Sequence, residues 1–355
     1  MIEVNNLIKI SKYAGERFDL VQSGGGNSSA KMSNGEMFIK ASGFFLSEIE
    51  KNVGYATINN TELLSYLDKL VIPIKKDDKN KADNIINKVN LTKNIRPSIE
   101  TYLHAYTRKY TLHTHPITVN ILLCRKNWRE LVKNLFEDCL CVPYATPGID
   151  LAIEILSSMK QADFNKDNYP KLIFLQNHGL IVNSNDSNEV IELTEYVTNI
   201  IEKELNLDYD RYRNSTKVSK LINKISDEIL IAHTSNDNAI IKCLKSHKSI
   251  LFKKPFCPDT LVYCGFNLVE IENLNSLDPL INYRKKYNSL PKVILYKDVI
   301  YLLAKNLKKA KEIEDVLRFH VLVSFQNLKT EINNLSDDEM SFLDNWDAEK
   351  FRQDL

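Results

Sequence analysis

The 355-residue sequence lacks several features, and each absence narrows what the protein can be. It has no charge imbalance: the formal net charge is +1 at pH 7, so nothing favours a nucleic acid or a membrane surface as a partner. No apolar run approaches the roughly 18 residues of a membrane-spanning helix. The first six residues have neither the basic nor the apolar region of a signal peptide, which predicts a cytoplasmic protein.

The sequence also lacks paired cysteines. Its six cysteines are Cys124, Cys139, Cys141, Cys243, Cys257 and Cys264. No CxxC motif occurs, and Cys139 and Cys141 are too close in the chain for an ordinary disulfide. Without a secretion signal, these residues are expected to be reduced thiols, and their spacing makes them poor metal ligands.

Histidine is scarce, so the arrangement of a few residues is informative. Residues 110–115 are rich in β-formers, and residues two apart on a strand share a face. His113 and His115 therefore point the same way, which begins a metal site or forms a surface pair. His178, in a turn between two apolar strands, supplies a third imidazole. The other four, interpreted as buried or surface residues without a ligand role, are His104, His233, His247 and His320.

A helix start precedes the histidine pair. Pro97 and Ser98 predict a helix that runs to about Lys109, with Ser98 as the N-cap and Glu100 in the first turn. Glu100 has two interpretations. It is a fourth ligand or a base beside the metal, or it is a favourable charge at a helix N-terminus.

Two turns of small residues flank a predicted hairpin. Residues 23–31 contain three consecutive glycines, and residues 41–43 follow a predicted strand over residues 37–40. Glycine permits a tight turn and a close approach to a ligand, and successive free N–H groups can cradle a phosphate. The alternative is a pair of ordinary hairpin turns.

Hydrophobic periodicity predicts alternating helices and strands along the rest of the chain. Predicted helices cover residues 7–18, 60–70, 119–123, 128–136, 149–159 and 189–205, the last capped by Asp186 or Ser187. Predicted strands cover residues 20–22, 55–58, 140–144, 171–175 and 180–182. The charged residues 75–88 are interpreted as a solvated loop or a surface helix.

The chain is predicted to divide into residues 1–210, a polar linker over residues 211–238, and a smaller αβ module over residues 239–355. Residues 170–182 match residues 291–303 without a gap, and an amphipathic helix follows each match. The match indicates a duplicated strand–turn–strand–helix unit or arises by chance. In the second copy Val299 takes the place of His178, so the copy cannot bind a metal there.

Six motifs, in chain order, resemble the class II aldolase/adducin family over roughly residues 1–210. They are Gly24–Lys31, Lys40–Gly43, Pro97–Glu100, His113–Pro116, Cys141–Thr146 and Asn177–Gly179. The resemblance implies an α/β/α fold with a central, mostly antiparallel sheet, often in a homotetramer with sites at subunit interfaces. The C-terminal module resembles, less specifically, the extension of the longer sugar-phosphate aldolases, and we expect it to act in assembly or as a lid.

The resemblance also implies residue roles. Zinc, or another divalent metal such as Mn²⁺ or Co²⁺, would bind His113, His115 and His178. Glu100 would be the acid/base beside the metal, and Tyr144 would be a proton donor reaching into a neighbouring subunit's site. The residues that would hold a substrate phosphate are Gly26, Asn27, Ser42, Gly43 and Ser98. One departure is Ile99, where some members have a second serine.

The expected function is metal-dependent retro-aldol cleavage of a small phosphorylated ketose to dihydroxyacetone phosphate and an aldehyde. One alternative is 4-epimerisation, dehydration or decarboxylation of a sugar phosphate at the same site. Another is a non-catalytic, adducin-like binding or scaffold protein. The presence of all three histidines and Glu100 argues against the scaffold, since a vestigial site would not be expected to keep them all.

Overall fold

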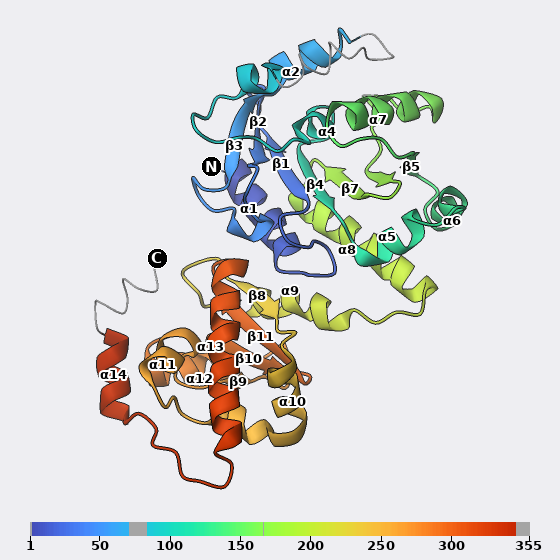
Figure 1. The fold of residues 1–355 in the computed structure, drawn as a ribbon. Coiled ribbons are helices and arrows are strands. Elements are labelled where there is room, and N and C mark those ends of the chain that lie inside the picture. The colour runs from blue at the N-terminus through green and yellow to red at the C-terminus, as the bar shows by residue number, and fades with distance from the viewer. Residues whose placement is uncertain (1, 71–83, 166, 346–355) are drawn as a thin grey trace. The chain divides into compact units, whose positions relative to one another are not determined.

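A computed structural model describes residues 2–70, 84–165 and 167–345 of the chain (Figure 1). The chain divides into two compact units, Met1–Tyr209 and Asp210–Leu355. No helix among the described residues is long and apolar enough to cross a membrane. All six cysteines are free thiols.

A seven-stranded sheet with the order β3-β2-β1-β4-β7-β6-β5 forms the centre of the first unit. Its strands are β1 (Asn27–Lys31), β2 (Glu36–Lys40), β3 (Tyr55–Asn59), β4 (Tyr110–Thr114), β5 (Cys139–Val142), β6 (Leu172–Leu175) and β7 (Gly179–Ser184). Neighbouring strands are antiparallel except β5 and β6, which are parallel. The predicted, mostly antiparallel sheet is therefore confirmed.

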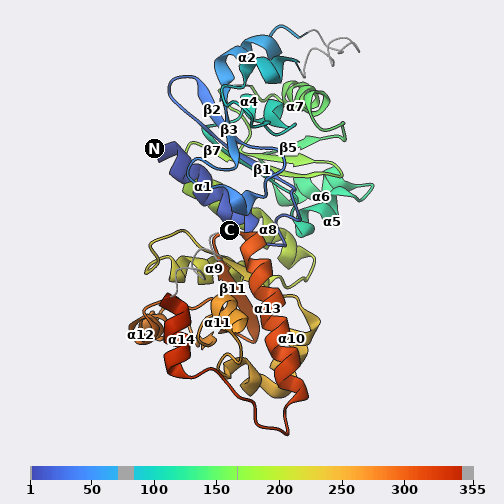
Figure 2. The ribbon, with the colours of Figure 1, turned by 60° about the vertical axis from the view of Figure 1, so that its left-hand side comes forward.

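Helices cover both faces of this sheet (Figures 1 and 2). One face carries α1 (Ile2–Gly15), α5 (Ile117–Leu123), α6 (Trp128–Leu135) and α8 (Ser187–Glu204). The other carries α2 (Asn60–Leu67), α4 (Thr101–Ala105) and α7 (Ile149–Gln161). Residues 84–89 are also helical, and η1 (Leu46–Glu48) is a 3-10 turn. Each face has its own apolar core, which gives the predicted α/β/α layers.

Several local predictions need correction. The predicted strand over residues 20–22 is not a strand: Leu20 ends a turn, and its carbonyl accepts the N–H of His115 at 2.9 Å, so a tertiary contact uses this backbone. The predicted helix over residues 98–109 is shorter in the structure. Only α4 (Thr101–Ala105) is helical, and Ser98 and Glu100 form a turn before it. Helix α2 begins at Asn60 as predicted, with Asn59 as its cap, but it ends at Leu67 and not at residue 70. Most of residues 75–88 lie outside the described part of the chain.

The second unit has a four-stranded sheet with the order β8-β11-β10-β9. Its strands are β8 (Ile231–Thr234), β9 (Val269–Glu270), β10 (Val293–Tyr296) and β11 (Val299–Ala304). Its helices are α9 (Asp210–Ile222), α10 (Asn238–His247), η2 (Lys248–Phe252), α11 (Pro258–Cys264), α12 (Asp278–Tyr287), α13 (Leu307–Gln326) and α14 (Asp337–Asn345). The predicted linker over residues 211–238 is wrong. These residues form α9 and β8, and their apolar side chains join the core of this unit.

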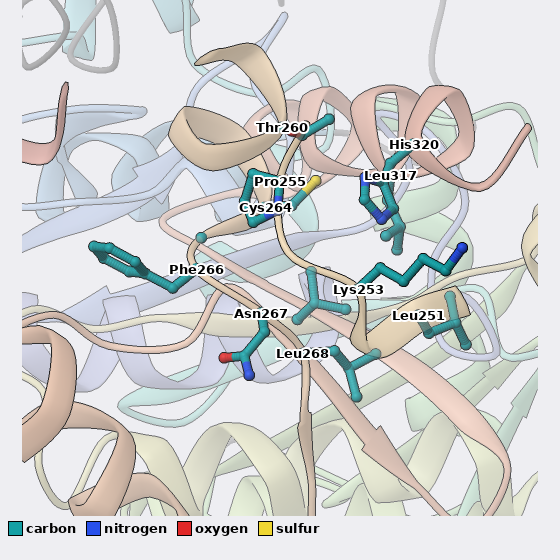
Figure 3. Close-up of a pocket in the computed structure, with 12 residues that line it drawn as sticks. Leu251, Lys253, Pro255, Thr260, Cys264, Phe266, Asn267, Leu268, Leu317 and His320 are labelled. Atoms are coloured by element: carbon teal, nitrogen blue, oxygen red, sulfur yellow. The ribbon is translucent and has the colours of Figure 1, made fainter. Parts of the chain in front are cut away.

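A small hollow with a volume of about 20 Å³ lies between α11 and α13 in the second unit (Figure 3). Its walls are mostly apolar, and Leu251, Leu268 and Leu317 are among them. Thr260 and His320 are buried polar residues at this wall, and the ring of His320 stacks on Phe256 with the centroids 5.4 Å apart. The ring therefore serves the packing of this unit.

Candidate metal centre

Strand β4 carries the first two histidines of the candidate metal centre. It lies between β1 and β7 near the middle of the sheet, and all of its side chains are buried. His113 is on the strand, and His115 follows just after its last residue. Because residues two apart share a face, both imidazoles turn to the same side, and their Nε2 atoms lie 3.1 Å apart.

His178 comes from a short turn, residues 176–178, between β6 and β7. The strands pair Leu175 with Gly179, and Asn177 has a left-handed backbone with φ 52°. This turn places the Nε2 of His178 3.2 Å from the Nε2 of His113. The structure thus brings the three histidines together from β4 and from the β6–β7 turn.

Two glycines allow the backbone to approach these rings. A Cβ on Gly179 would lie 2.3 Å from the carbonyl oxygen of Thr114 and 2.9 Å from the Cδ2 of His115. A Cβ on Gly25 would lie 2.9 Å from the Nδ1 of His115. Such contacts are too short, so both positions favour glycine. The glycine-rich loop singled out in the sequence therefore packs against the histidine cluster.

The ring nitrogens fit a bound cation. The Nδ1 of His113 lies 3.0 Å from the carbonyl oxygen of Leu180, which only accepts, so Nδ1 carries the proton and Nε2 offers a lone pair. Zinc–nitrogen bonds of about 2.0–2.1 Å in a tetrahedral site place the ligand nitrogens about 3.3 Å apart. The distances of 3.1 and 3.2 Å between the Nε2 atoms are close to that spacing. Three imidazoles can therefore share one divalent cation here.

Glu100 adds a carboxylate to the cluster. It lies directly before α4, with Oε1 3.2 Å from the Nε2 of His178 and Oε2 3.6 Å from the Nε2 of His113. Burial raises the pKa of this carboxyl, but the neighbouring imidazoles lower it to about 2 overall. Burial, with the other imidazoles, lowers the pKa of His115 to about 3. The site therefore favours an ionised carboxylate beside imidazoles that resist protonation, and a bound cation would satisfy both.

Two of the residues predicted to bind phosphate lie against Glu100. Asn27 begins β1, and its Nδ2 donates to the Oε2 of Glu100 at 2.6 Å. The Oγ of Ser98 accepts the backbone N–H of Glu100 at 3.2 Å. Both side chains are buried and already hydrogen-bonded, so their contact with a phosphate stays a prediction.

The other three predicted phosphate residues lie in the two glycine turns. Gly26 and Gly43 have left-handed backbones, with φ 69° and 87°. The N–H of Ser42 donates to the carbonyl of Arg96 at 2.8 Å, which ties the second turn to the segment before Ser98. No atom of the described residues lies within 4 Å of a Cβ built on Gly43, so this turn borders open space where a ligand has room.

Lys40 is a residue without a role predicted from the sequence. It ends β2, directly before the second turn, and its side chain is almost fully buried. Its Nζ lies 3.5 Å from the carbonyl oxygens of Gly24 and Ala41, one in each turn. Burial lowers its pKa, and the charges of Glu100 and Glu48 oppose that shift. A buried ammonium with two long hydrogen bonds has capacity for an anion. A lysine directly before a small-residue turn was the available signal.

Tyr144 is exposed and is not hydrogen-bonded to the histidine cluster within the described residues. It lies on the loop after β5, where its backbone N–H donates to the Oε1 of Gln176 at 3.1 Å. Its side chain is 59% exposed. The predicted role of Tyr144 in a neighbouring subunit's site stays a prediction.

Comparison with known proteins gives three findings. The profile of the family described as the Class II Aldolase and Adducin N-terminal domain matches residues 5–205, more than half of the chain. A Bacillus subtilis (strain 168) protein named uncharacterized oxidoreductase YuxG is 26% identical over 188 residues, which are 50% of this chain and 26% of that protein. The chain thus spans about a quarter of the length of this relative.

Two solved structures are similar to the first unit. The N-terminal class II aldolase domain of a conserved protein from Thermoplasma acidophilum is 23% identical, with a TM-score of 0.49, over 57% of this chain and 93% of that one. A sugar-phosphate aldolase from Thermotoga maritima is 16% identical, with a TM-score of 0.40, over 57% and 94% of the two chains.

Proposed function

Because the chain belongs to the class II aldolase and adducin family, we propose that it is a divalent-metal-dependent lyase. The reaction would be retro-aldol cleavage of a small phosphorylated ketose to dihydroxyacetone phosphate and an aldehyde. The observation that supports it best is the convergence of three Nε2 atoms beside the ionised carboxylate of Glu100. Such a set of groups suits proton transfer at the carbon next to a ketone, because a bound cation can stabilise the negative charge that develops on the ketone oxygen.

His113, His115 and His178 would hold the cation, and Zn²⁺, Mn²⁺ or Co²⁺ all accept imidazole ligands. A bound divalent cation supplies positive charge against the negative oxygen that develops when a bond next to a ketone breaks. The protein orients its ligands beforehand: the backbone of Leu180 fixes the His113 ring, and Gly179 leaves room for the ring of His115.

Glu100 would move the proton. Its Oε2 is held by Asn27, whereas its Oε1 is buried without a hydrogen-bond partner. An ionised Oε1 can take a proton from the hydroxymethyl carbon of dihydroxyacetone phosphate, and the C–H electron pair then passes into the enediolate. In the cleavage direction the same carboxyl returns that proton to carbon. Tyr144 of a neighbouring subunit in a homo-oligomer, a tetramer by family resemblance, would serve the aldehyde oxygen.

The substrate phosphate would lie between the two glycine turns. Lys40 would supply the charge, and the backbone N–H groups of Gly26 and Gly43, with the hydroxyl of Ser42, would supply donors. Asn27 and Ser98 would complete the set. The left-handed backbone and open surroundings of Gly43 support this placement. Lys40 would add an attraction for phosphate that makes up for the hydroxyl missing at Ile99.

The decisive experiment is proton–deuterium exchange at the hydroxymethyl carbon of dihydroxyacetone phosphate, followed by NMR in heavy water. We expect stereospecific exchange that a chelator stops and added metal restores. Glu100→Gln should abolish exchange and keep the metal, whereas the control Glu314→Gln, in the second unit, should change neither.

Three other outcomes would contradict the proposal. A metal-loaded protein without exchange would favour the epimerase, dehydratase or decarboxylase alternatives, and product analysis would separate them. A protein that holds no metal and shows no exchange would favour the adducin-like scaffold. Full exchange by Glu100→Gln would remove Glu100 from its role.

A further inference from the structure

His104 is a buried histidine outside the metal cluster that contacts the residues around Glu100. It lies on α4, four residues after Glu100, so the two side chains share a face of this segment. Its ring is completely buried. The Nδ1 lies 2.7 Å from the Oγ of Ser29, and the Nε2 is hydrogen-bonded to the Oδ1 of Asn27. Asn27 and Ser29 are two apart on β1 and so face the same side.

We infer that His104 is a positioning residue, which orients the amide of Asn27 and thereby fixes the carboxylate of Glu100 for proton transfer. The inference rests on the proposed function, since it assigns Glu100 as the group that moves the proton. It differs from the expectation that His104 is an ordinary buried residue.

The hydrogen-bond types settle the orientation of each group in turn. The ionised Oε2 of Glu100 only accepts, so the group of Asn27 that lies 2.6 Å from it must be the Nδ2 donor. The Oδ1 of Asn27 then faces His104, and because Oδ1 only accepts, the Nε2 of His104 must carry the proton. The Nδ1 of His104 is therefore bare, and the hydroxyl of Ser29 must donate to it.

The short helix α4 is held at both ends, which keeps the ring in place. Before the helix, Ser98 accepts the N–H of Glu100 at 3.2 Å. After it, the buried Nζ of Lys31 donates to the carbonyl of His104 at 2.6 Å and to the carbonyl of Arg108 at 3.1 Å. A cation on the last carbonyls is favourable at a helix C-terminus. Burial also lowers the pKa of His104 to about 3, so the ring is neutral and can have one fixed tautomer.

The network leaves the two oxygens of Glu100 unequal. Oε2 is held by Asn27, and Oε1 has no hydrogen bond and lies 3.2 Å from the Nε2 of His178. If the donor on His104 is removed, the amide of Asn27 is free to turn. The carboxylate then loses its fixed direction, while the three metal ligands keep theirs. The expected cost falls on proton transfer and not on metal binding.

Two variants test this. His104→Leu removes the donor, and His104→Gln places an amide N–H near the position of Nε2, so it should still orient Asn27. We expect His104→Leu to lower kcat of the exchange reaction about 10- to 100-fold, the usual loss when an outer hydrogen-bond partner in a metal site is removed. Its bound metal should stay near wild type. His104→Gln should recover most of kcat. Equal losses of kcat in both variants, or a loss of bound metal, would overturn the inference.

A second measurement is independent of activity. ¹⁵N NMR of the metal-loaded, histidine-labelled protein, with His104→Gln used to assign the signal, should show a His104 ring with a protonated Nε2 and a bare Nδ1. Ser29→Ala should change this signal, since it removes the donor to Nδ1. A protonated Nδ1 in the wild type would refute the inference even if exchange occurs. The expected tautomer in a protein that shows no exchange would instead leave the network intact and refute the proposed function.

Discussion

The two sheets of this chain share one plan, yet among the described residues only the first carries a cluster of three histidines that could hold a metal. In the first unit, β4 pairs antiparallel with β7, β7 antiparallel with β6, and β6 parallel with β5. In the second unit, β8, β11, β10 and β9 pair in the same order and the same directions. Each hairpin is followed by a long helix, α8 or α13. A duplicated unit would give this agreement; the duplication itself stays a prediction.

The hairpin turns differ by one residue. The first joins Leu175 to Gly179 through residues 176–178, whereas the second joins Tyr296 to Val299 through residues 297–298. The gapless match in the sequence is therefore wrong at this turn. Val299 corresponds to Gly179 in the pairing and does not replace His178. The second hairpin has no position that corresponds to His178. Its turn has only two residues, Lys297 and Asp298, with φ 50° and 55°.

Strands β4 and β8 correspond to each other, and β8 has no histidine at the positions that match those of the first unit. His113 pairs with Ile181, and the matching partner in the second sheet, Tyr301, pairs with Thr234. The hydroxyl of Thr234 lies 2.8 Å from that of Ser215, so this position is used for packing. By the same register, His115 corresponds to Asn236.

The carboxylates near these positions also differ. Glu314 of α13 accepts from the hydroxyl of Ser235 at 2.7 Å and from the N–H of Asn236 at 3.1 Å, and its other oxygen binds Lys311. Glu100, in contrast, keeps a buried oxygen without a hydrogen bond. The shared plan of the two sheets therefore provides positions only. A candidate metal site arises where a turn, three imidazoles and an incompletely bonded carboxylate coincide.

The largest expected effect comes from making the first turn resemble the second. His178→Ala removes one of three imidazole ligands, and we expect metal affinity to fall by more than about 100-fold, because even partners outside the ligand shell cost 10- to 100-fold. Competition with a chelator, followed by metal analysis, measures this. The control His247→Ala, in the second unit, should keep full affinity. Equal affinities in the two variants would mean that the histidine cluster does not hold the metal.

The sequence predicted the parts of this site that depend on local spacing. His113 and His115 share a face because they are two apart on a strand, and α8 begins after Asp186, whose side chain caps it as expected. The parts it missed depend on long-range pairing. Asn27 is in a strand and not in the glycine loop, because β1 pairs with β4.

Distance along the chain also explains the two residues that gained a role only from the structure. His104 meets Asn27 across 77 positions, and no local pattern reports such a contact. Lys40 directly precedes the second turn, and only its contact with the carbonyl of Gly24, 16 positions away, depends on long-range packing. These contacts between distant residues became visible only when the strands were assembled.

A smaller effect is expected from Gly179→Ala. This change places a side chain where the first hairpin has glycine, as Val299 does at the corresponding position of the second hairpin. The new Cβ would meet the carbonyl of Thr114 and the ring of His115. We expect the free energy of unfolding to fall by about 2–3 kcal/mol, as for overpacked sites, together with weaker metal binding. Urea denaturation and metal titration measure the two effects. Val299→Ala is the matched control and should cost about 1 kcal/mol or less, with metal binding unchanged. Similar behaviour of the two variants would show that the close approach at Gly179 is not needed.

The smallest expected effect tests the structural carboxylate of the second unit. Burial alone would raise the pKa of Glu314, but hydrogen bonds from Lys311 and Ser235 lower it below its usual value. A carboxyl whose pKa is lower in the folded state adds stability above its unfolded pKa of about 4.3, and that stability is lost as the pH falls through the folded pKa. We expect Glu314→Gln to reduce the free energy of unfolding by about 1–2 kcal/mol at pH 7. The difference from wild type should vanish in acid, as urea denaturation from pH 7 to pH 3 would show. If it persisted in acid, the packing of the Glu314 side chain, and not its charge, would hold the turn after β8, and the contrast with Glu100 would weaken.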